Sequence, residues 1–223
     1  MGERKVEKAI FAFKRHPSRA MADFEDYYVN RHAALGRTLL RCSSGYRVNI
    51  THAENGPDAY TEQWLHKVTD ILDPLTAYGS MEDFEMVLAD DRDLFAGFEL
   101  YVVEREEEVV PGIAPPFVQG AMTPGGKTIS AFADAVALPP VPAGARRVID
   151  NHVCCKLGFT AAGLIERKSS EVAVFRMCWA EDGGSIEGPG AALVNEYRQL
   201  EEPAPGWHRV CIRAPESDAG AGQ

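Results

Sequence analysis

The sequence predicts an α+β fold in which two ferredoxin-like βαββαβ halves form a barrel. Three observations favour this fold. Strand-length and helix-length patterns follow the order βαββαβ up to residue 110, and the same order recurs after a proline-rich connection at 110–116. In addition, 45% of the 223 residues are hydrophobic, which suffices for a packed core. If the two open sheet faces pack on each other, each half buries what the other exposes.

The first half, 1–110, opens with a strand and a helix that hold the main candidate residue. The apolar run Ala9–Phe13 has the length of a buried strand and is bounded by charged residues and then by Pro17. Ser18 can cap the next helix. Apolar residues recur along this helix at spacings of three, four and seven: Met21, Phe24, Tyr28, Leu35 and Leu39. His32 falls on the same stripe, so we expect it to face the sheet.

Three further strands and a second helix complete this half. They are strands over 46–52, 60–66 and 98–103 and a helix that Ser80 caps, with its apolar stripe at Phe84, Val87, Leu88 and Phe95. Alternation places Tyr46 and His52 on one face of the first of these strands. It places Glu62 and Trp64 on one face of the next, whose pattern is weaker because both faces are mixed.

The second half, 117–214, repeats the pattern without repeating the residues. We expect strands over 117–122, 147–157, 171–179 and 207–213, a helix over 128–138, and a helix from Pro189 with Leu193, Tyr197 and Leu200 on one face. Residues 215–223 read as a disordered tail. Two such halves would form a pseudo-two-fold pair fused in one chain.

Composition excludes several classes of function. The net charge of -10, from 33 acidic and 23 basic residues, argues against a nucleic-acid partner. The sequence contains no apolar run of about 18 residues, the length that a membrane span needs. Five cysteines without CxxC spacing or a secretory leader favour a reduced, cytoplasmic protein. Nucleotide-binding, zinc and nucleophile-elbow signatures are lacking, and the loop at 120–128 is one residue too long for a phosphate loop.

Four short motifs of the first half resemble the EthD family. They are Phe13-Lys-Arg, the helix ending Asp23-Phe-x-x-Tyr27-Tyr-x-x-Arg31-His32-Ala33, the strand Gly45-Tyr46-Arg, and Met81-x-Asp83-Phe84. The resemblance implies a dimeric α+β-barrel type of fold whose cavity holds a small organic molecule, often aromatic or polyketide-like. Members similar to it include cofactor-free decarboxylases and dehydratases. The second half lacks the histidine and the Lys-Arg pair, so we expect one working cavity, in the N-terminal half.

The resemblance carries the family's helix histidine over to His32. Imidazole titrates near neutral pH, so His32 can act as general acid or base, with Tyr28 or Tyr46 positioning it. The competing interpretation is a core histidine bonded to a backbone carbonyl.

Five residues are candidates for substrate binding. Arg15 and Lys14 could hold an anionic group, and Trp64, His52 and Glu62 could project from neighbouring strands into the barrel. Solvated strand ends are the competing interpretation of the two basic residues and of the histidine. The acidic residues Glu82, Asp83, Glu85, Asp90, Asp91 and Asp93 read as a solvated helix face.

The sequence thus favours a cofactor-independent and metal-free lyase or isomerase acting on a small aromatic or carbonyl-bearing metabolite. A non-catalytic, metabolite-binding barrel is the main alternative. A haem or oxygen-using monooxygenase, with His32 or His152 as the axial ligand, is a lesser one. Closure of the barrel within one chain and closure across a homodimer both fit the sequence.

Overall fold

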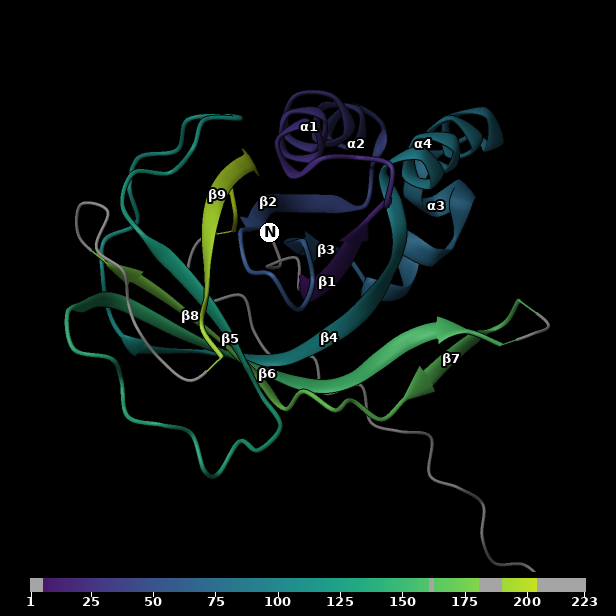
Figure 1. Ribbon diagram of the computed structural model, residues 1–223. Helices are drawn as coiled ribbons and strands as arrows, with labels where there is room; N and C mark the ends of the chain where they lie inside the picture. Colours follow the sequence, from purple (N-terminus) through teal and green to yellow (C-terminus); the bar gives the residue numbers. More distant parts are fainter. Residues whose placement is uncertain (1–5, 161–162, 181–189, 204–223) are drawn as a thin grey trace, which may run out of the picture.

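The computed structural model describes residues 6–160, 163–180 and 190–203, which form a closed antiparallel barrel with helices on its outer side (Figure 1). The strands are β1 Glu7–Arg15, β2 Ser43–Thr51, β3 Ala59–Leu65, β4 Phe95–Val110, β5 Lys127–Phe132, β6 Ala145–Phe159, β7 Ile165–Lys168, β8 Val174–Ala180 and β9 Ala192–Leu200. The helices are α1 Met21–Tyr27, the π-helix Tyr28–His32, α2 Ala33–Leu39, the short 3₁₀ turn Val68–Leu72, α3 Pro74–Tyr78 and α4 Met81–Leu94. The predicted α+β barrel is therefore confirmed.

The strand order shows a pseudo-two-fold relation between the halves. The sheet runs β4-β1-β3-β2-β9-β5-β8-β6-β7, and β6 pairs back with β4 to close the barrel. The first four strands and the next four have the same order, fourth-first-third-second within each half, which is that of a ferredoxin-like unit. Strand β7 extends the sheet beyond the barrel. The barrel thus closes within one chain, and a homodimer is not needed to complete it.

In the second half, two of the expected strands, 147–157 and 171–179, are found as β6 and β8, and strands replace both expected helices. Strand β5 occupies the start of the predicted helix over 128–138, and β9 holds the residues of the other predicted helix. Leu193 and Tyr197 misled the interpretation because a spacing of four keeps two residues on one face of a helix and of a strand alike. The segment 117–122 forms only a single bridge, from Met122 to Tyr197, and the predicted strand 207–213 and tail lie outside the described residues.

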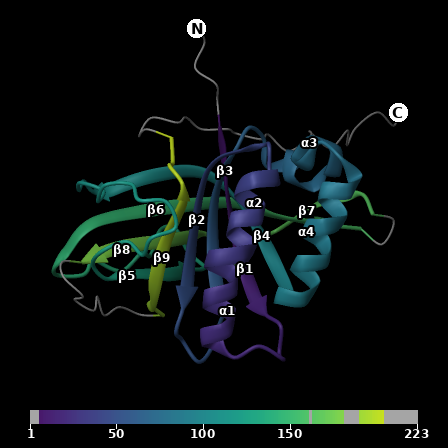
Figure 2. The ribbon, with the colours of Figure 1, turned by 90° about the horizontal axis from the view of Figure 1, so that it is seen from above.

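The helices of the first half cover the outer face of strands β1, β2 and β3, as Figure 2 shows. Along β1, the side chains of Ala9, Phe11 and Phe13 join the core beneath the helices. Ile10 and Ala12 join the second core, inside the barrel. This alternation results from the two-residue period of a strand. Each residue of these strands therefore belongs either to the helix side or to the barrel interior.

Two helix starts test the predicted caps. The Ser80 hydroxyl accepts a hydrogen bond from Asp83 N at 3.1 Å, so Ser80 caps α4 as predicted. The first helix begins at Met21, and the Ser18 hydroxyl lies 2.7 Å from Nδ1 of His16 instead, so the prediction of a Ser18 cap is wrong. Within the described ranges, every helix is too short or too polar to cross a bilayer.

Candidate functional site

A cavity of about 550 Å³ lies between the helices and the outer face of the first-half sheet. Its wall is mainly aromatic and aliphatic, with Phe11, Phe13, Leu40, Ile71, Leu72, Phe84, Val87, Leu88 and Phe98 among the lining residues. The polar side chains that reach this wall are those of Tyr28, His32, Tyr46, Gln63, Tyr78 and Asp91. A few polar groups in an apolar cavity of this size are typical of a small-molecule site.

His32 is held on the cavity wall by two acidic residues of α4. It is the last residue of the π-helix and is only 7% exposed. Its Nδ1 lies 2.7 Å from Oδ2 of Asp90, and its Nε2 lies 3.7 Å from Oδ1 of Asp91. The rings of Tyr28 and Phe95 meet the imidazole edge-on, at centroid distances of 5.0 and 5.2 Å. The imidazole is therefore fixed in orientation by hydrogen bonding and by packing.

The environment drives the pKa values of the two carboxyl groups apart. Burial alone would raise the pKa of Asp90, but hydrogen bonds from His32 and from the Tyr27 hydroxyl, 2.6 Å away, outweigh it and lower the pKa. Burial raises the pKa of Asp91, which lacks comparable hydrogen bonds, and the negative charge of Asp90 adds to this rise. Asp90 is thus the permanent carboxylate of the pair, and Asp91 is the more easily protonated group.

Two tyrosine hydroxyls lie deeper in the cavity. The hydroxyl of Tyr28 is 2.5 Å from Oγ1 of Thr61. Burial raises the pKa of Tyr28 and of Tyr46 far above the usual value, and each also interacts with the hydroxyl of the other. Both side chains are therefore neutral at physiological pH and can donate or accept hydrogen bonds. The structure thus brings together His32, Tyr28 and Tyr46, the three residues that the sequence singled out for catalysis.

Gln63 adds a polar group next to Tyr46, its register partner on the adjacent strand. Its Oε1 is buried and accepts no hydrogen bond from any of the described residues. A buried amide oxygen without a donor costs free energy, on the order of 1 to 3 kcal/mol. A ligand or a water molecule in the cavity could supply that donor.

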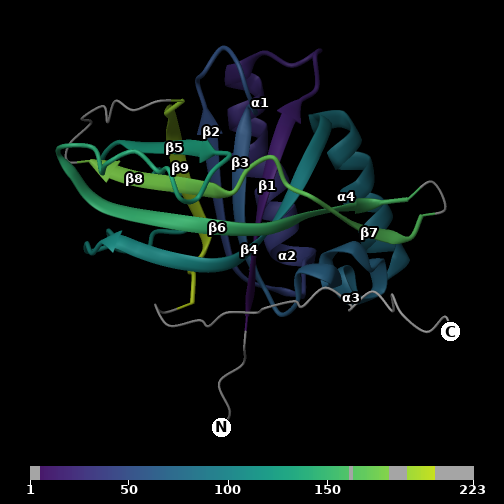
Figure 3. The ribbon, with the colours of Figure 1, turned by 90° about the horizontal axis from the view of Figure 1, so that it is seen from below.

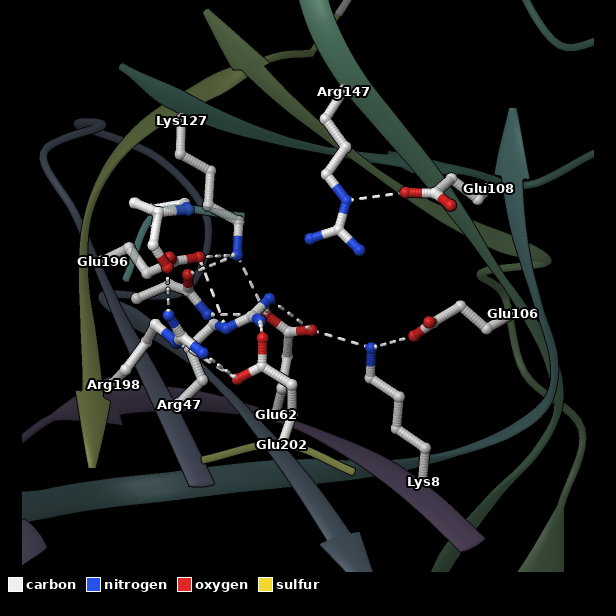
Figure 4. Close-up of polar contacts among 12 residues, drawn as sticks. Lys8, Arg47, Glu62, Glu106, Glu108, Lys127, Arg147, Glu196, Arg198 and Glu202 are labelled. Carbon is white, nitrogen blue, oxygen red and sulfur yellow. Dashed lines mark hydrogen bonds and ion pairs between the residues drawn. The ribbon is translucent and has the colours of Figure 1, made fainter. Parts of the chain in front are cut away.

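Glu62 and Trp64 lie inside the barrel rather than on the cavity. The sequence correctly placed them on one face of a strand, but strand alternation points this face away from the helices. Glu62 is completely buried, and its carboxylate lies 2.7 Å from Lys8 Nζ and 2.9 Å from Lys127 Nζ. The Lys8 ammonium also lies 4.5 Å from the centre of the Trp64 ring. Glu62 belongs to an interior ionic network (Figure 4), and Trp64 packs against its Lys8.

The ionic network ties the two halves of the barrel together. Lys127 of β5 contacts Glu62 of β3 and, at 2.6 Å, Glu196 of β9. Arg47 of β2 lies 3.2 Å from Glu62 and 3.4 Å from Glu196. Burial alone would raise the pKa of both glutamates, but the surrounding cations lower that of Glu62 well below its usual value and that of Glu196 to about 2. Both groups are ionised, which keeps the buried charges compensated.

The remaining predicted binding residues lie outside the cavity that holds His32. Lys14 and Arg15 end β1 and pair with Asp58, with nitrogen-oxygen distances of 3.6 and 3.3 Å. His52 lies just past the end of β2, and its Nε2 lies 2.9 Å from Nδ2 of Asn195. Their positions match the solvated strand ends that were the competing interpretation. They are therefore not part of the candidate site.

Sequence reasoning missed Asp90 and Asp91. Both were assigned to the solvated face of their helix, which holds for exposed Glu82, Glu85 and Asp93. A signal was available, because Asp91 comes seven residues after Phe84 and so falls on the apolar stripe. An acidic residue on the buried face of a helix needs a partner, and here that partner is His32.

The contacts of His152 argue against it as a haem ligand. Nδ1 of His32 is bonded to Asp90 and its Nε2 faces Asp91, while Nε2 of His152 lies 2.8 Å from Arg105 Nη2 and 3.3 Å from Glu107. An axial ligand must present a free nitrogen to the iron. Nε2 of His152 is engaged by Arg105 and Glu107, whereas Nε2 of His32 lies beyond hydrogen-bond distance of Asp91 and keeps its lone pair. Among the residues that the structure describes, no cluster of three or more His, Cys, Asp or Glu side chains could hold a metal ion.

Comparison with known proteins does not identify a family. No family model matches the chain, and no curated protein matches it. One solved structure, described as an anthrone oxidase-like protein, is 10% identical, with a TM-score of 0.48, and the match covers 91% of this chain and 97% of that one. A likeness this distant says nothing about chemistry. The resemblance of the first half to the EthD family therefore stays a prediction.

Proposed function

We propose that the protein is a cofactor-independent enzyme of the lyase or isomerase type, which moves a proton on a small aromatic or carbonyl-bearing metabolite in the helix-side cavity. The observation that carries this proposal is the pairing of His32 with Asp90 on the wall of an apolar cavity, at a nitrogen-oxygen distance of 2.7 Å. A histidine oriented by a carboxylate is a common arrangement for a general base.

The hydrogen bond to Asp90 assigns the tautomer of His32. Because an ionised carboxylate only accepts, Nδ1 carries the proton and Nε2 keeps a lone pair. Nε2 can then remove a proton from a carbon next to a carbonyl group. The Asp90 carboxylate stabilises the imidazolium that forms, and the apolar walls strengthen this interaction by excluding water.

The tyrosines and Asp91 supply the other half of the reaction. The neutral hydroxyls of Tyr28 and Tyr46 can donate to the enolate oxygen that develops when the proton leaves. Asp91, whose pKa burial raises, can pass a proton to the product and then take up the proton that Nε2 of His32, 3.7 Å away, removed from the substrate. Proton removal, charge stabilisation and proton return thus each have a group on the same cavity.

Deuterium exchange tests proton transfer without knowledge of the natural substrate. The purified protein is incubated in D₂O with β-tetralone, an aromatic ketone, and loss of its α-proton signals is followed by NMR with no added cofactor. We expect exchange above the buffer rate, and a fall of about 100-fold or more in His32→Gln. The matched control is His66→Gln, which removes an exposed imidazole outside the cavity.

One observation favours the alternative of a metabolite-binding barrel. The buried Oε1 of Gln63 accepts no hydrogen bond from the described residues, and a bound metabolite could donate one. Ligand-detected NMR in the same samples separates the two. Binding of the ketone without exchange would contradict the enzyme and support the binding protein. A folded His32→Gln variant that exchanges as fast as the wild type would likewise contradict a base role for His32.

A further inference from the structure

Two adjacent cysteines of β6 meet at their sulfur atoms. Cys154 Sγ and Cys155 Sγ are 3.6 Å apart. This is unexpected from sequence, because successive side chains of a regular strand point to opposite faces of the sheet. The backbone must therefore be irregular at this position.

The irregularity lies on both edges of β6. On one edge, Val102 of β4 pairs with Cys155 and Val103 pairs with Val153, so Cys154 is the extra residue of a β-bulge. On the other edge, the ladder with β8 ends at His152, and the ladder with β7 begins at Lys156. Figure 3 shows β6 running past β8 at one end and beside β7 at the other. The two cysteines thus lie at a β-bulge, where the strand changes partners.

An arginine of the neighbouring strand faces both sulfur atoms. Arg167 Nη2 lies 3.3 Å from Cys155 Sγ and 3.9 Å from Cys154 Sγ. A hydrogen bond from the Cys154 thiol and the charge of Arg167 lower the pKa of Cys155 to about 6, although burial opposes this. The same hydrogen bond and burial raise the pKa of Cys154. The pair therefore consists of a thiolate, Cys155, and an adjacent thiol, Cys154.

The other described cysteines lack this environment. Burial raises the pKa of Cys42 to about 12 and that of Cys178 to about 11. Cys155 itself is buried, at 6% exposure, but Cys154 beside it is partly exposed and Arg167 is exposed, so the pair is approached from the solvent side of the β6–β7 hairpin. A reactive cysteine needs both a stabilised thiolate and access of this kind.

We propose that Cys154 and Cys155 form a vicinal dithiol that is oxidised by hydroperoxides, with Cys155 as the nucleophile and Cys154 as the resolving thiol. The Cys155 thiolate attacks the outer peroxide oxygen, which breaks the O–O bond, gives a sulfenic acid and releases an alkoxide or hydroxide that takes up a proton. The Cys154 sulfur then attacks the sulfenic sulfur, and water leaves as the disulfide forms. The peroxide is reduced by two electrons and the thiol pair is oxidised by two.

The test uses hydrogen peroxide on the whole purified protein, with subsequent trypsin digestion and mass spectrometry of the peptide Val148–Lys156, which contains both cysteines. In the wild type we expect this peptide to lose two hydrogen atoms, and dithiothreitol to restore them. In Cys154→Ser the sulfenic acid has no resolving thiol, so dimedone should label Cys155 instead. Cys155→Ser should give neither product, and Cys178→Ser should behave as the wild type.

The rate of iodoacetamide labelling at Cys155, measured as a function of pH, tests whether Arg167 stabilises the Cys155 thiolate. At pH 7 the wild-type rate should already be near its plateau, whereas Arg167→Gln should be about threefold slower and still rising with pH. Lys168→Gln, which removes an adjacent exposed cation, is the matched control. The proposal is overturned if the wild-type peptide keeps both thiols, or if dimedone labels the wild type as fully as Cys154→Ser.

Discussion

Asp90 and Asp91 are neighbours in sequence and both face His32, yet their environments give them opposite effects on stability. The pKa of Asp90 is lowered in the folded protein. Ionisation of Asp90 therefore stabilises the fold at pH values above its unfolded-state pKa, which is near 4. The pKa of Asp91 is raised, so its ionisation opposes folding as the pH rises through the folded value. Two adjacent carboxyl groups of one helix should therefore respond differently to neutralisation.

At pH 7, Asp90→Asn should lower the free energy of unfolding by about 1 to 3 kcal/mol, because it weakens the hydrogen bonds to His32 and Tyr27. Asp91→Asn should leave the free energy of unfolding unchanged or raise it, because a buried carboxylate is removed. Urea unfolding of the two variants checks both signs. Equal losses in the two variants would contradict the assignment of Asp90 as the orienting carboxylate.

The sequence located His32, Tyr28 and Tyr46, which the structure brings to one cavity. Glu62 and Trp64 do project into the barrel as expected, but the cavity lies on the other face of the sheet, because a strand pattern tells which residues share a face but not which layer that face meets. Lys14 and Arg15 drew attention by charge alone, although a turn carboxylate, Asp58, pairs with them. The pairing of His32 with Asp90 joins positions 58 residues apart, so no local pattern contains it.

At the scale of elements, the candidate site depends on how two helices present it. A π-helical turn carries His32 between α1 and α2, and such a turn inserts an extra residue that rotates the next helical residues to a different face. Helix α4 supplies Asp90 and Asp91 from its last turns. The sequence predicted both helices from their apolar stripes, but a stripe with a period of 3.6 does not reveal a π turn.

Ser80 anchors α4 by accepting a hydrogen bond from Asp83 N. Ser80→Ala should lower the free energy of unfolding by about 1 kcal/mol, because a first-turn N–H loses its partner. Ser80→Asp, which keeps a capping oxygen, is the control and should stay near the wild type. The measurement is urea unfolding at pH 7. A loss as large in the aspartate variant as in the alanine variant would show that the cap is not the cause.

At the scale of the whole molecule, the barrel closes although the described residues of the second half lack the predicted helices. Both halves keep the same strand order, and closure at β2–β9 and β4–β6 needs only strands. Helices that cover the outer face are found where the outward strand residues are large and apolar, as at Phe11 and Phe13 of β1. On β5 the corresponding outward positions include Thr128 and Ser130, which give a helix little to pack against. The helix-side cavity therefore forms on the first half, where the outward strand residues are large and apolar, and not on the described part of the second half.

Because of the interior ionic network, the free energy of unfolding of the barrel should fall at acidic pH. The pKa of Glu196 is about 2 in the folded protein and near 4.3 when unfolded, so its ionisation stabilises the fold fully above that unfolded value. This contribution, about 3 kcal/mol, is lost as the pH falls from there towards 2.

In urea unfolding from pH 7 to 2.5, Glu196→Gln should be destabilised at pH 7, since Lys127 and Arg47 lose a counter-charge. Its difference from the wild type should shrink below about pH 4, where the native carboxylate is itself being neutralised. Exposed Glu201→Gln is the control, and a difference that is constant with pH would contradict the ionic role of Glu196.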